Sequence, residues 1–372
     1  MRILFINSWY PNRILKQNGD FIQRHAEAVA LKHQVTAIHV KSDKNSKEII
    51  EINEENKNGL RTLIAYVKET NNPIIKSYRF LKAYFLLVKK AGDFELIHVN
   101  VLFPVGMIAY WLKKTKNIPY IISEHHSIYR SPFNKKIGFL QKFISKKIAK
   151  KASFIAPVSD NLSNAMQKLG LKGNYIKIPN VVDTKRFTPS TKKNEKFTIL
   201  HVSSMVKIKN IDGILSVVKK IESSIPNFHF QMIGGNAEDF LAKANKLGIS
   251  AKNITFKNQV SHQKIVDYFK RADVFILFSE TENTPCVILE SFSCGTPVIT
   301  TNVGGIAENF PKDFGILIEK NDEKALEEAI LKVYNGFKKA SSDTMHNYIN
   351  NHFSEDYICD AFTRLYKIAT KN

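Results

Sequence analysis

The sequence predicts an α/β protein with two Rossmann-like, doubly wound domains. Short apolar segments alternate with longer segments of helical periodicity, which is typical of repeated βαβ units with parallel sheets. This order restarts after a polar segment, residues 180–196, and the length of 372 residues exceeds what one core usually supports. In such sheets ligands bind beyond the carboxyl ends of the strands. We therefore expect the domains to face each other across a cleft that holds the site.

The first domain is predicted over residues 1–187. A stretch rich in Lys, Glu and Asn, residues 41–59, interrupts its alternating segments and is expected to be a surface excursion. The alternating segments are strand RILFIN, helix GDFIQRHAEAVALKH, strand QVTAIHV, strand FELIHVN, helix PVGMIAYWLKK and strand YIISE.

The second domain is predicted over residues 188–355, and residues 356–372 are predicted to form a C-terminal helix that packs back on the first domain. Its segments are FTILHVSS, NIDGILSVVKKIES, FHFQMIGG, FLAKANKLG, NITFKNQV, HQKIVDYFKRA and DVFILFS. The last strand leads into a loop and a helix for which Thr284 is the predicted N-cap and Pro285 the first residue. Gly295 is predicted to end this helix, and the strand VITT follows.

Composition and motifs disfavour several classes of protein. Hydrophobic residues make up 44% and charged residues 24%, as in soluble globular proteins. The start lacks the cleavage site of a signal peptide, and the longest apolar run, residues 96–112, contains His98, Asn100 and Pro104. The three cysteines have no metal-ligand spacing, which fits a reducing compartment. We expect a cytoplasmic protein without a membrane-spanning helix.

The net charge of +21 lies mostly in the first half of the chain. Residues 1–190 contain 32 Lys and Arg against 13 Asp and Glu, while the remainder contains 23 against 21. The densest segment, residues 135–151, has no acid and predicts one amphipathic helix. Its lysines are Lys135, Lys136, Lys142, Lys146, Lys147, Lys150 and Lys151, and its apolar stripe is Ile137, Leu140, Phe143, Ile144 and Ile148.

Two interpretations of this lysine-rich segment stay open. Its lysines can contact an anionic membrane surface, or the helix can pack on its own domain with a solvated basic face. Nucleic acid ranks below both as a partner, because no helix-turn-helix, zinc-finger or RNA-binding aromatic signature accompanies the charge. We therefore expect no nucleic-acid partner.

Two glutamates, Glu282 and Glu290, flank the predicted start of the helix after DVFILFS. A helix N-terminus can bind phosphate, and a carboxylate further along can accept two hydrogen bonds from a ribose diol, which suits a sugar nucleotide. Alternatively, Glu282 is a helix-dipole partner near the cap and Glu290 a solvated helix residue. As the acid and base of a glycoside hydrolase, the two would need a fixed separation that a sequence does not give.

The segment ENTPCVILESFSCGTPVITTNVGGIAE resembles the Glu-x7-Glu donor-site signature of retaining glycosyltransferases of family 4, which have the two-domain GT-B fold. The resemblance continues through INSWYPN, NGDFIQRHAEAVA, ISEHHS, PVSDNLSNAMQKLG, IPNVVDTKRFTP and FSEDYICDAFTRLYKIA. It implies a metal-independent hexosyl- or N-acetylhexosaminyltransferase of the bacterial polysaccharide or glycolipid type. The donor would be a UDP- or GDP-linked sugar, no cofactor or metal is expected, and the first domain would bind a glycan or lipid-linked acceptor.

The resemblance also implies roles for residues of the second domain. Glu290 would bind the ribose hydroxyls, Glu282 would contact hydroxyls of the transferred sugar, and Lys209 would neutralise the diphosphate leaving group. Backbone amides around Asn283 and Thr284 would approach the sugar and the diphosphate.

In the first domain, the resemblance implies that the Gly19 backbone meets the phosphates and that His125 faces the donor sugar, while His126 is expected to be structural. The chain departs from the family at Ser204, where an Arg is common, so Lys207 or another group would meet that part of the diphosphate charge. Each position also has a structural alternative, such as a surface lysine, a turn glycine or a satisfied histidine.

We therefore predict a retaining glycosyltransferase, cytoplasmic or peripheral on the inner face of the cytoplasmic membrane. Three alternatives stay open: a GT-B-fold nucleotide-sugar epimerase or phosphorylase, a basic nucleic-acid-binding protein, and an inactive sugar-nucleotide-binding protein.

Overall fold

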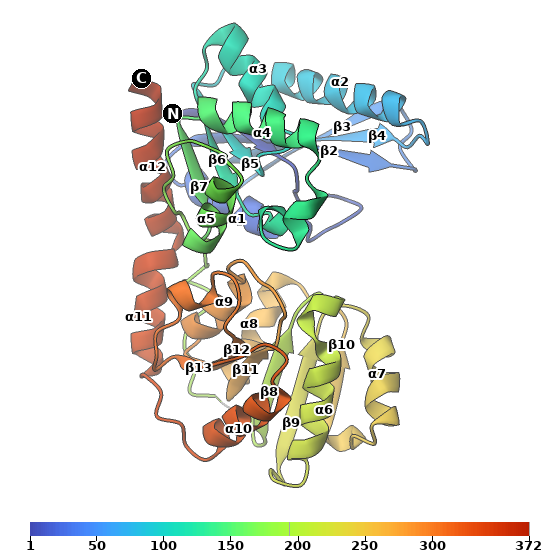
Figure 1. The fold of residues 1–372 in the computed structure, drawn as a ribbon, viewed down its shortest axis with the longest axis vertical. Helices are drawn as coiled ribbons and strands as arrows, with labels where there is room; N and C mark the ends of the chain where they lie inside the picture. Colours follow the sequence, from blue (N-terminus) through green and yellow to red (C-terminus); the bar gives the residue numbers. More distant parts are fainter. Residues whose placement is uncertain (193, 372) are drawn as a thin grey trace. The chain divides into compact units, whose positions relative to one another are not determined.

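The computed structural model describes residues 1–192 and 194–371, and the chain forms two compact units (Figure 1). Unit 1 comprises Met1–Val181 and Glu355–Asn372, and unit 2 comprises Val182–Ser354. Lys193 of the predicted linker and the C-terminal Asn372 lie outside the described residues. Each unit has a sheet of mainly parallel strands, which confirms the predicted fold class of two α/β domains.

The unit boundaries differ slightly from those expected. The sequence predicts a boundary after Phe187, but the Phe187 side chain packs in a core of unit 2. The Val182 N–H donates to the Phe353 carbonyl at 2.8 Å, so the chain has already joined unit 2 there. It returns to unit 1 at Glu355, one residue before the predicted position.

Unit 1 contains the strands β1 (Arg2–Asn7), β2 (Gln34–Asp43), β3 (Ile50–Lys57), β4 (Leu60–Lys68), β5 (Leu96–Asn100), β6 (Tyr120–Glu124) and β7 (Phe154–Pro157). They form one sheet in the order β3-β4-β2-β1-β5-β6-β7, parallel except for the antiparallel pair β3 and β4. The predicted excursion over residues 41–59 does lie mostly at the surface, but it does not interrupt the sheet, because most of it belongs to β2 and to the edge strand β3. The Asn58-Gly59 turn joins β3 to β4 with φ of 52° and 78°, and this pair is a common hairpin signal.

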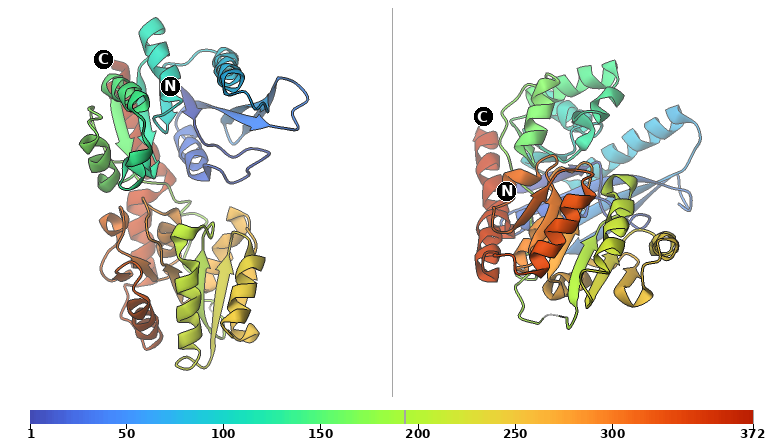
Figure 2. Two further views of the ribbon diagram at one scale, coloured as in Figure 1. Left: turned by 45° about the vertical axis from the view of Figure 1, so that its right-hand side comes forward. Right: turned by 60° about the horizontal axis from the view of Figure 1, so that its bottom comes forward.

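The helices of unit 1 are α1 (Asp20–Ala30), α2 (Pro73–Ala91), α3 (Gly106–Lys116), α4 (Phe139–Lys151), α5 (Asp160–Lys168) and α12 (Glu355–Lys371), with short 3-10 turns at Ser127–Tyr129 and Phe133–Lys136. Buried residues of α2, α3, α4 and α5 share one hydrophobic core, and those of α1 and α12 share another. Helices therefore cover both faces of the sheet. Figure 2 gives two further views of these layers.

The predicted amphipathic helix over residues 135–151 is partly wrong. Gly138 is extended, with φ −67° and ψ 160°, so α4 begins only at Phe139. The helix buries Ser145, Ile148 and Ala149. Of the predicted apolar stripe, only Ile148 is fully buried, because the helix turns Leu140 and Phe143 towards solvent.

Unit 2 contains the strands β8 (Phe197–Val202), β9 (Phe228–Ile233), β10 (Ile254–Lys257), β11 (Val274–Leu277), β12 (Val298–Thr301) and β13 (Gly315–Ile318). Its helices are α6 (Ile211–Ile221), α7 (Ala237–Lys246), α8 (His262–Arg271), α9 (Cys286–Ser293), α10 (Glu323–Tyr334) and α11 (Ser342–Phe353), with 3-10 turns at Lys207–Lys209, Ala251–Asn253 and Ile306–Asn309. The sheet order is β10-β9-β8-β11-β12-β13, with all neighbours parallel.

The helix α9 begins one residue later than predicted. Pro285 is the N-cap residue, in an extended conformation, and Cys286 is the first helical residue. The predicted end is confirmed, because Gly295 has φ 71° and donates its N–H to the Phe292 carbonyl at 2.9 Å.

Within residues 1–192 and 194–371, no helix combines the length and the apolar composition needed to cross a membrane. The three cysteines, Cys286, Cys294 and Cys359, form no disulfide in this part of the chain.

Candidate functional site

The candidate site of unit 2 lies where the order of strands in its sheet reverses. The strands β8 and β11 are neighbours, but the chain continues from β8 to β9 on one side and from β11 to β12 on the other. Loops after two such strands leave a ligand-binding crevice at their carboxyl ends. Here the Glu280 N–H donates to the Ile208 carbonyl at 2.8 Å, which ties the two loops together.

These loops bring Lys209 and Glu282 into an ion pair between Nζ and Oε1. The two side chains are only 14% and 11% exposed, so solvent screens their attraction weakly. The same oxygen of Glu282 accepts a hydrogen bond from Ser279 Oγ at 2.7 Å. The carboxylate is thus oriented by two groups, and Ser279 was not among the predicted site residues.

The second predicted glutamate, Glu290, is buried on α9 with its side chain 3% exposed. His262 Nε2, at the start of α8, donates a hydrogen bond to its Oε1 at 2.9 Å. The His262 ring packs against Phe187 at a centroid distance of 5.0 Å. The sequence did not predict His262 as a site residue, because no pattern at the start of α8 indicates that this side chain contacts Glu290 on another helix.

The loop before α9 holds the other predicted donor-site residues of this segment. The Asn283 carbonyl accepts a hydrogen bond from the Gly305 N–H at 3.0 Å, and Thr284 is buried. Pro285 ends the loop as the N-cap of α9. Asn283, Thr284 and Pro285 lie beside Glu282 because they follow it directly in the chain.

The loop after β8 holds Ser204 and Lys207, both exposed. Neighbouring Ser203, rather than Ser204, makes the structural contacts: its Oγ lies 2.8 Å from Nε2 of His201 and accepts from the Met205 N–H at 3.0 Å. Ser204 thus offers a hydroxyl at the position where the resemblance implies that an Arg is common.

Gly19 and His125 lie in unit 1, where aromatic side chains connect them. Gly19 has φ 73°, and a Cβ there would lie 2.8 Å from the Trp9 backbone, so only glycine fits without strain. The Phe21 ring lies 6.3 Å from the Trp9 ring and 4.8 Å from the His125 ring. Gly19 therefore precedes α1 at the edge of the same cluster that contains His125.

His125 is buried, and burial holds its pKa well below the ordinary value, so its imidazole is neutral. His25, whose ring lies 5.4 Å away, has a pKa lowered by burial to about 4. The adjacent His126 has a local role: its Nδ1 accepts from the Ile128 N–H at 2.9 Å and caps a 3-10 turn.

A further buried group, Glu124, was not among the predicted site residues. It ends β6 and accepts hydrogen bonds from the N–H groups of Leu102, His125 and His126 at 2.8 to 2.9 Å. Burial raises its pKa to about 7, against these hydrogen bonds. The sequence signal for this residue is a glutamate at a strand end, directly before two histidines. In the structure, Glu124 holds the backbone at His125 through these hydrogen bonds.

The lysines of the predicted basic patch lie on two elements of unit 1. Lys135 and Lys136 belong to the 3-10 turn Phe133–Lys136, and the other five lie on α4. Lys142 is half-buried and the others are exposed. Among the described residues of the chain, no group of three or more His, Cys, Asp and Glu side chains is placed to hold a metal ion.

Two family profiles match the chain. Residues 22–186 match the family described as Glycosyltransferase Family 4, and residues 182–352 match Glycosyl transferases group 1. The chain is 26% identical over 282 residues to an uncharacterized glycosyltransferase of Methanocaldococcus jannaschii, covering 71% of this chain and 74% of that protein. It is 25% identical over 290 residues to the putative teichuronic acid biosynthesis glycosyltransferase TuaC of Bacillus subtilis, covering 74% and 71%.

Solved structures of similar fold include sucrose-phosphate synthase from Thermosynechococcus elongatus, with a TM-score of 0.79 and 18% identity, covering 99% of this chain and 98% of that one. Anabaena HepE in complex with UDP-glucose has a TM-score of 0.73 and 15% identity, covering 99% and 100%. The fold and the two profiles agree with the resemblance read from the sequence. The chain belongs to glycosyltransferase family 4, and its two units are the two α/β domains of the GT-B fold.

Proposed function

We propose that this glycosyltransferase is a retaining, metal-independent enzyme that moves a hexosyl or N-acetylhexosaminyl group from a nucleotide diphosphate sugar to a hydroxyl. The observation that carries the proposal is the Lys209–Glu282 ion pair where the order of strands in the unit 2 sheet reverses, with buried Glu290 on the following helix. Structural neighbours of this chain hold UDP and UDP-glucose, which supports a nucleotide-linked donor.

In this proposal, unit 2 binds the donor. Glu290 accepts hydrogen bonds from the two ribose hydroxyls, since a carboxylate has enough lone pairs to keep His262 as well. The diphosphate lies at the N-terminus of α9, where the helix dipole favours an anion. Lys209 and Lys207 supply positive charge, and the hydroxyl of Ser204 replaces the cation common at that position.

The chemical step needs stabilisation of the departing diphosphate. Lys209 is poised for this, because it is mostly shielded from water and already carries a partner carboxylate. Glu282 then turns to hydroxyls of the transferred sugar, held by Ser279. The acceptor hydroxyl attacks the anomeric carbon from the face that the diphosphate leaves, and its proton departs on the diphosphate. Neutral His125 and the Gly19 backbone of unit 1 are assigned to the sugar and the phosphates.

The acceptor is proposed to be a glycan or a lipid-linked glycan bound by unit 1. The names of relatives support this class, since one is a putative teichuronic acid biosynthesis glycosyltransferase and another is the protein CapJ of Staphylococcus aureus. We place the enzyme in the cytoplasm, with peripheral attachment to the inner face of the membrane through the lysines of α4.

The proposal is tested by incubating the full chain with a panel of UDP- and GDP-sugars and a mixed pool of glycan and lipid-linked acceptors. A new glycosidic bond with the donor's anomeric configuration, read by NMR, is the expected result. An altered sugar nucleotide would indicate an epimerase, release of a sugar phosphate a phosphorylase, and binding without turnover an inactive binder. An inverted anomeric configuration would overturn the retaining assignment alone.

A further inference from the structure

One face of unit 1 combines two properties that rarely occur together on a water-exposed surface. This basic-apolar face is the exposed side of α2, α3 and α4, which Figure 1 shows in one layer of the unit. The three helices contain no Asp or Glu. Their cations are Lys76, Arg79, Lys82, Lys89, Lys90, Lys113, Lys114, Lys116, Lys142, Lys146, Lys147, Lys150 and Lys151.

The same helices expose large apolar side chains. Among the described residues, ten of the 21 exposed large apolar side chains lie on them. They are Ile74, Ile75, Tyr78, Leu81, Leu86, Met107, Trp111, Phe139, Leu140 and Phe143. Phe139 is 88% exposed and Ile74 77%, so neither contributes to the core of unit 1. Single exposed apolar residues are ordinary, but a concentration of this kind marks an interaction surface.

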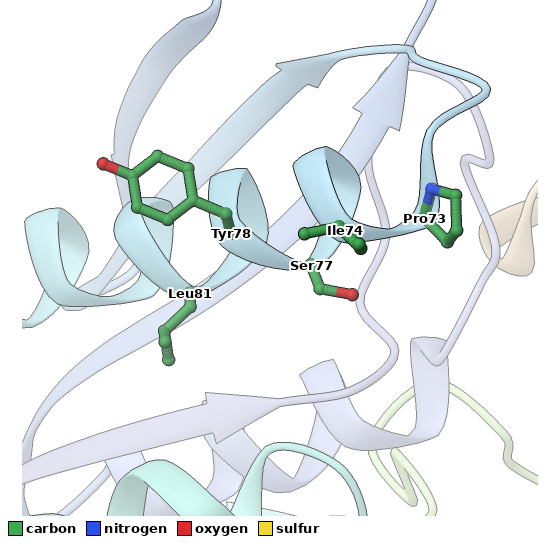
Figure 3. Close-up of a pocket in the computed structure, with 5 residues that line it drawn as sticks. All are labelled: Pro73, Ile74, Ser77, Tyr78 and Leu81. Atoms are coloured by element: carbon green, nitrogen blue, oxygen red, sulfur yellow. The ribbon is translucent and has the colours of Figure 1, made fainter.

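The first two turns of α2 project from the body of the unit. Residues 73–78 are exposed on every side of the helix, although three of them are Ile74, Ile75 and Tyr78. A hollow of about 480 Å³ runs along this end (Figure 3). Its lining residues are Pro73, Ile74, Ser77, Tyr78 and Leu81.

The apolar and basic side chains are sorted along the helices. Each of α2, α3 and α4 ends a few residues before the next parallel strand, so each begins at the carboxyl edge of the sheet. Eight of the ten apolar side chains lie in the first halves of their helices, and most of the lysines lie in the second halves. The apolar ends therefore gather at the edge that also carries His125 and Gly19.

We propose that the basic-apolar face docks on an anionic lipid bilayer, with the N-terminal ends of α2 and α4 inserted among the acyl chains. Apolar and aromatic side chains beside many lysines are the features of interfacial membrane contacts. The complete absence of carboxylates on the three helices gives charge complementarity to anionic headgroups rather than to a protein of mixed charge. Docking in this way brings the carboxyl edge of the unit 1 sheet to the lipid surface, where a lipid-linked acceptor is anchored.

This proposal deepens the peripheral membrane attachment of the proposed function, on which it rests. Vesicle binding is measured without sugar transfer, so the docking proposal and the transfer reaction can fail separately. The test is co-flotation of the full chain with vesicles of phosphatidylcholine, with and without phosphatidylglycerol. We expect binding only to the anionic vesicles, weakening as salt is added.

Two sets of variants separate the apolar from the electrostatic contribution. Serine in place of Ile74, Tyr78, Phe139 and Leu140 is expected to weaken vesicle binding at least about tenfold, because inserted apolar area is lost. The matched control places serine at Leu31 and Ile368, which are exposed on the opposite face of unit 1 and should leave binding unchanged. All six positions are exposed, so we expect these serines to leave the fold intact.

Glutamine in place of Lys142, Lys146 and Lys147 is expected to weaken binding about a hundredfold, as each lysine near the surface contributes several-fold. The control replaces exposed Lys312, Lys320 and Lys332 of unit 2 with glutamine. Equal loss in both charge variants, or equal binding to neutral and anionic vesicles, would overturn the proposal. So would a dimer that the serine variants dissociate, or retention on RNA or DNA that the same lysines control without vesicle binding.

Discussion

His262 and Glu290 form a hydrogen-bonded pair at 2.9 Å between α8 and α9, and the Glu290 side chain is almost completely buried. One oxygen of the carboxylate is therefore held by the imidazole. In the proposed reaction, this fixes the plane in which Glu290 meets the ribose.

Replacing Glu290 with alanine is expected to lower the affinity for the nucleotide sugar at least about 100-fold, because two hydrogen bonds to a charged acceptor are lost. A thermal-shift screen against UDP- and GDP-sugars measures this, since a ligand of the folded state raises the melting temperature. Full donor affinity in Glu290→Ala would remove the ribose assignment.

The positioning role of His262 gives a separate prediction. His262→Phe keeps a ring against Phe187 but removes the N–H that donates to Glu290. The affinity for the nucleotide sugar is therefore expected to fall about tenfold, the value of one such hydrogen bond. His262→Gln restores an N–H and should recover most of it. Isothermal titration of the two variants decides this, and equal losses would show that the pair does not orient the carboxylate.

The Lys209–Glu282 pair predicts an effect on the rate. Lys209→Gln retains a hydrogen bond to Glu282 but removes the charge, and kcat is expected to fall about 100- to 1,000-fold, as for other groups that stabilise a leaving anion. Lys332→Gln on α10 is the control, since that lysine is exposed and far along the chain from the site loops. A rise in KM alone, with kcat intact, would be incompatible with the assigned role.

The Gly19 position predicts a stability difference between two glycines of similar φ. Gly19 and Gly59 have φ of 73° and 78°, but only at Gly19 would a Cβ meet backbone atoms, at 2.8 Å from Trp9. Gly59→Ala is expected to cost about 1 kcal/mol of unfolding free energy from the left-handed conformation, and Gly19→Ala about 3 kcal/mol or more. Urea unfolding of both variants measures the difference, and equal costs would contradict the close approach.

Unit 1 is expected to lose stability in acid. Burial lowers the pKa of His25 and His39 to about 4, and that of His98 and His125 well below the ordinary value. The unfolded chain takes up a proton near pH 6.5 and the folded unit does not, so stability falls as the pH drops from 6.5 towards 4. Each of the first two histidines contributes about 3 kcal/mol to this loss.

Glu124 acts in the opposite direction, because its pKa is raised to about 7 and protonation favours the folded unit as the pH falls. The contribution of Glu124 to the unfolding free energy offsets that of about one histidine. Unit 1 therefore still loses stability as the pH falls. Both tryptophans, Trp9 and Trp111, lie in unit 1, so their fluorescence reports its unfolding. His25→Gln should flatten the pH dependence, while the variant of exposed His352, His352→Gln, should leave it unchanged.

Local chemistry was sufficient to predict much of this fold. A uniformly apolar segment such as VFIL predicts a buried strand. A glycine directly after an apolar helix, such as Gly295, predicts the helix end, because a few neighbouring residues set the backbone geometry there. The Asn58-Gly59 pair is likewise a local signal, because it favours a two-residue hairpin turn. The start of α4 depends on the extended conformation of Gly138, which the helical periodicity of the apolar residues does not predict.

The sequence by itself determined the two α/β domains, the family, and the residues at which chemistry was expected. Only the tertiary structure decided which of these residues meet within unit 2. Lys209 and Glu282 are 73 residues apart, and His262 and Glu290 28 apart, yet both pairs form because parallel strands place their following loops at one edge. Likewise, three acid-free helices become one basic-apolar face only when the sheet sets them in a layer. Pairing and layering are long-range consequences of sheet order, which no local pattern encodes.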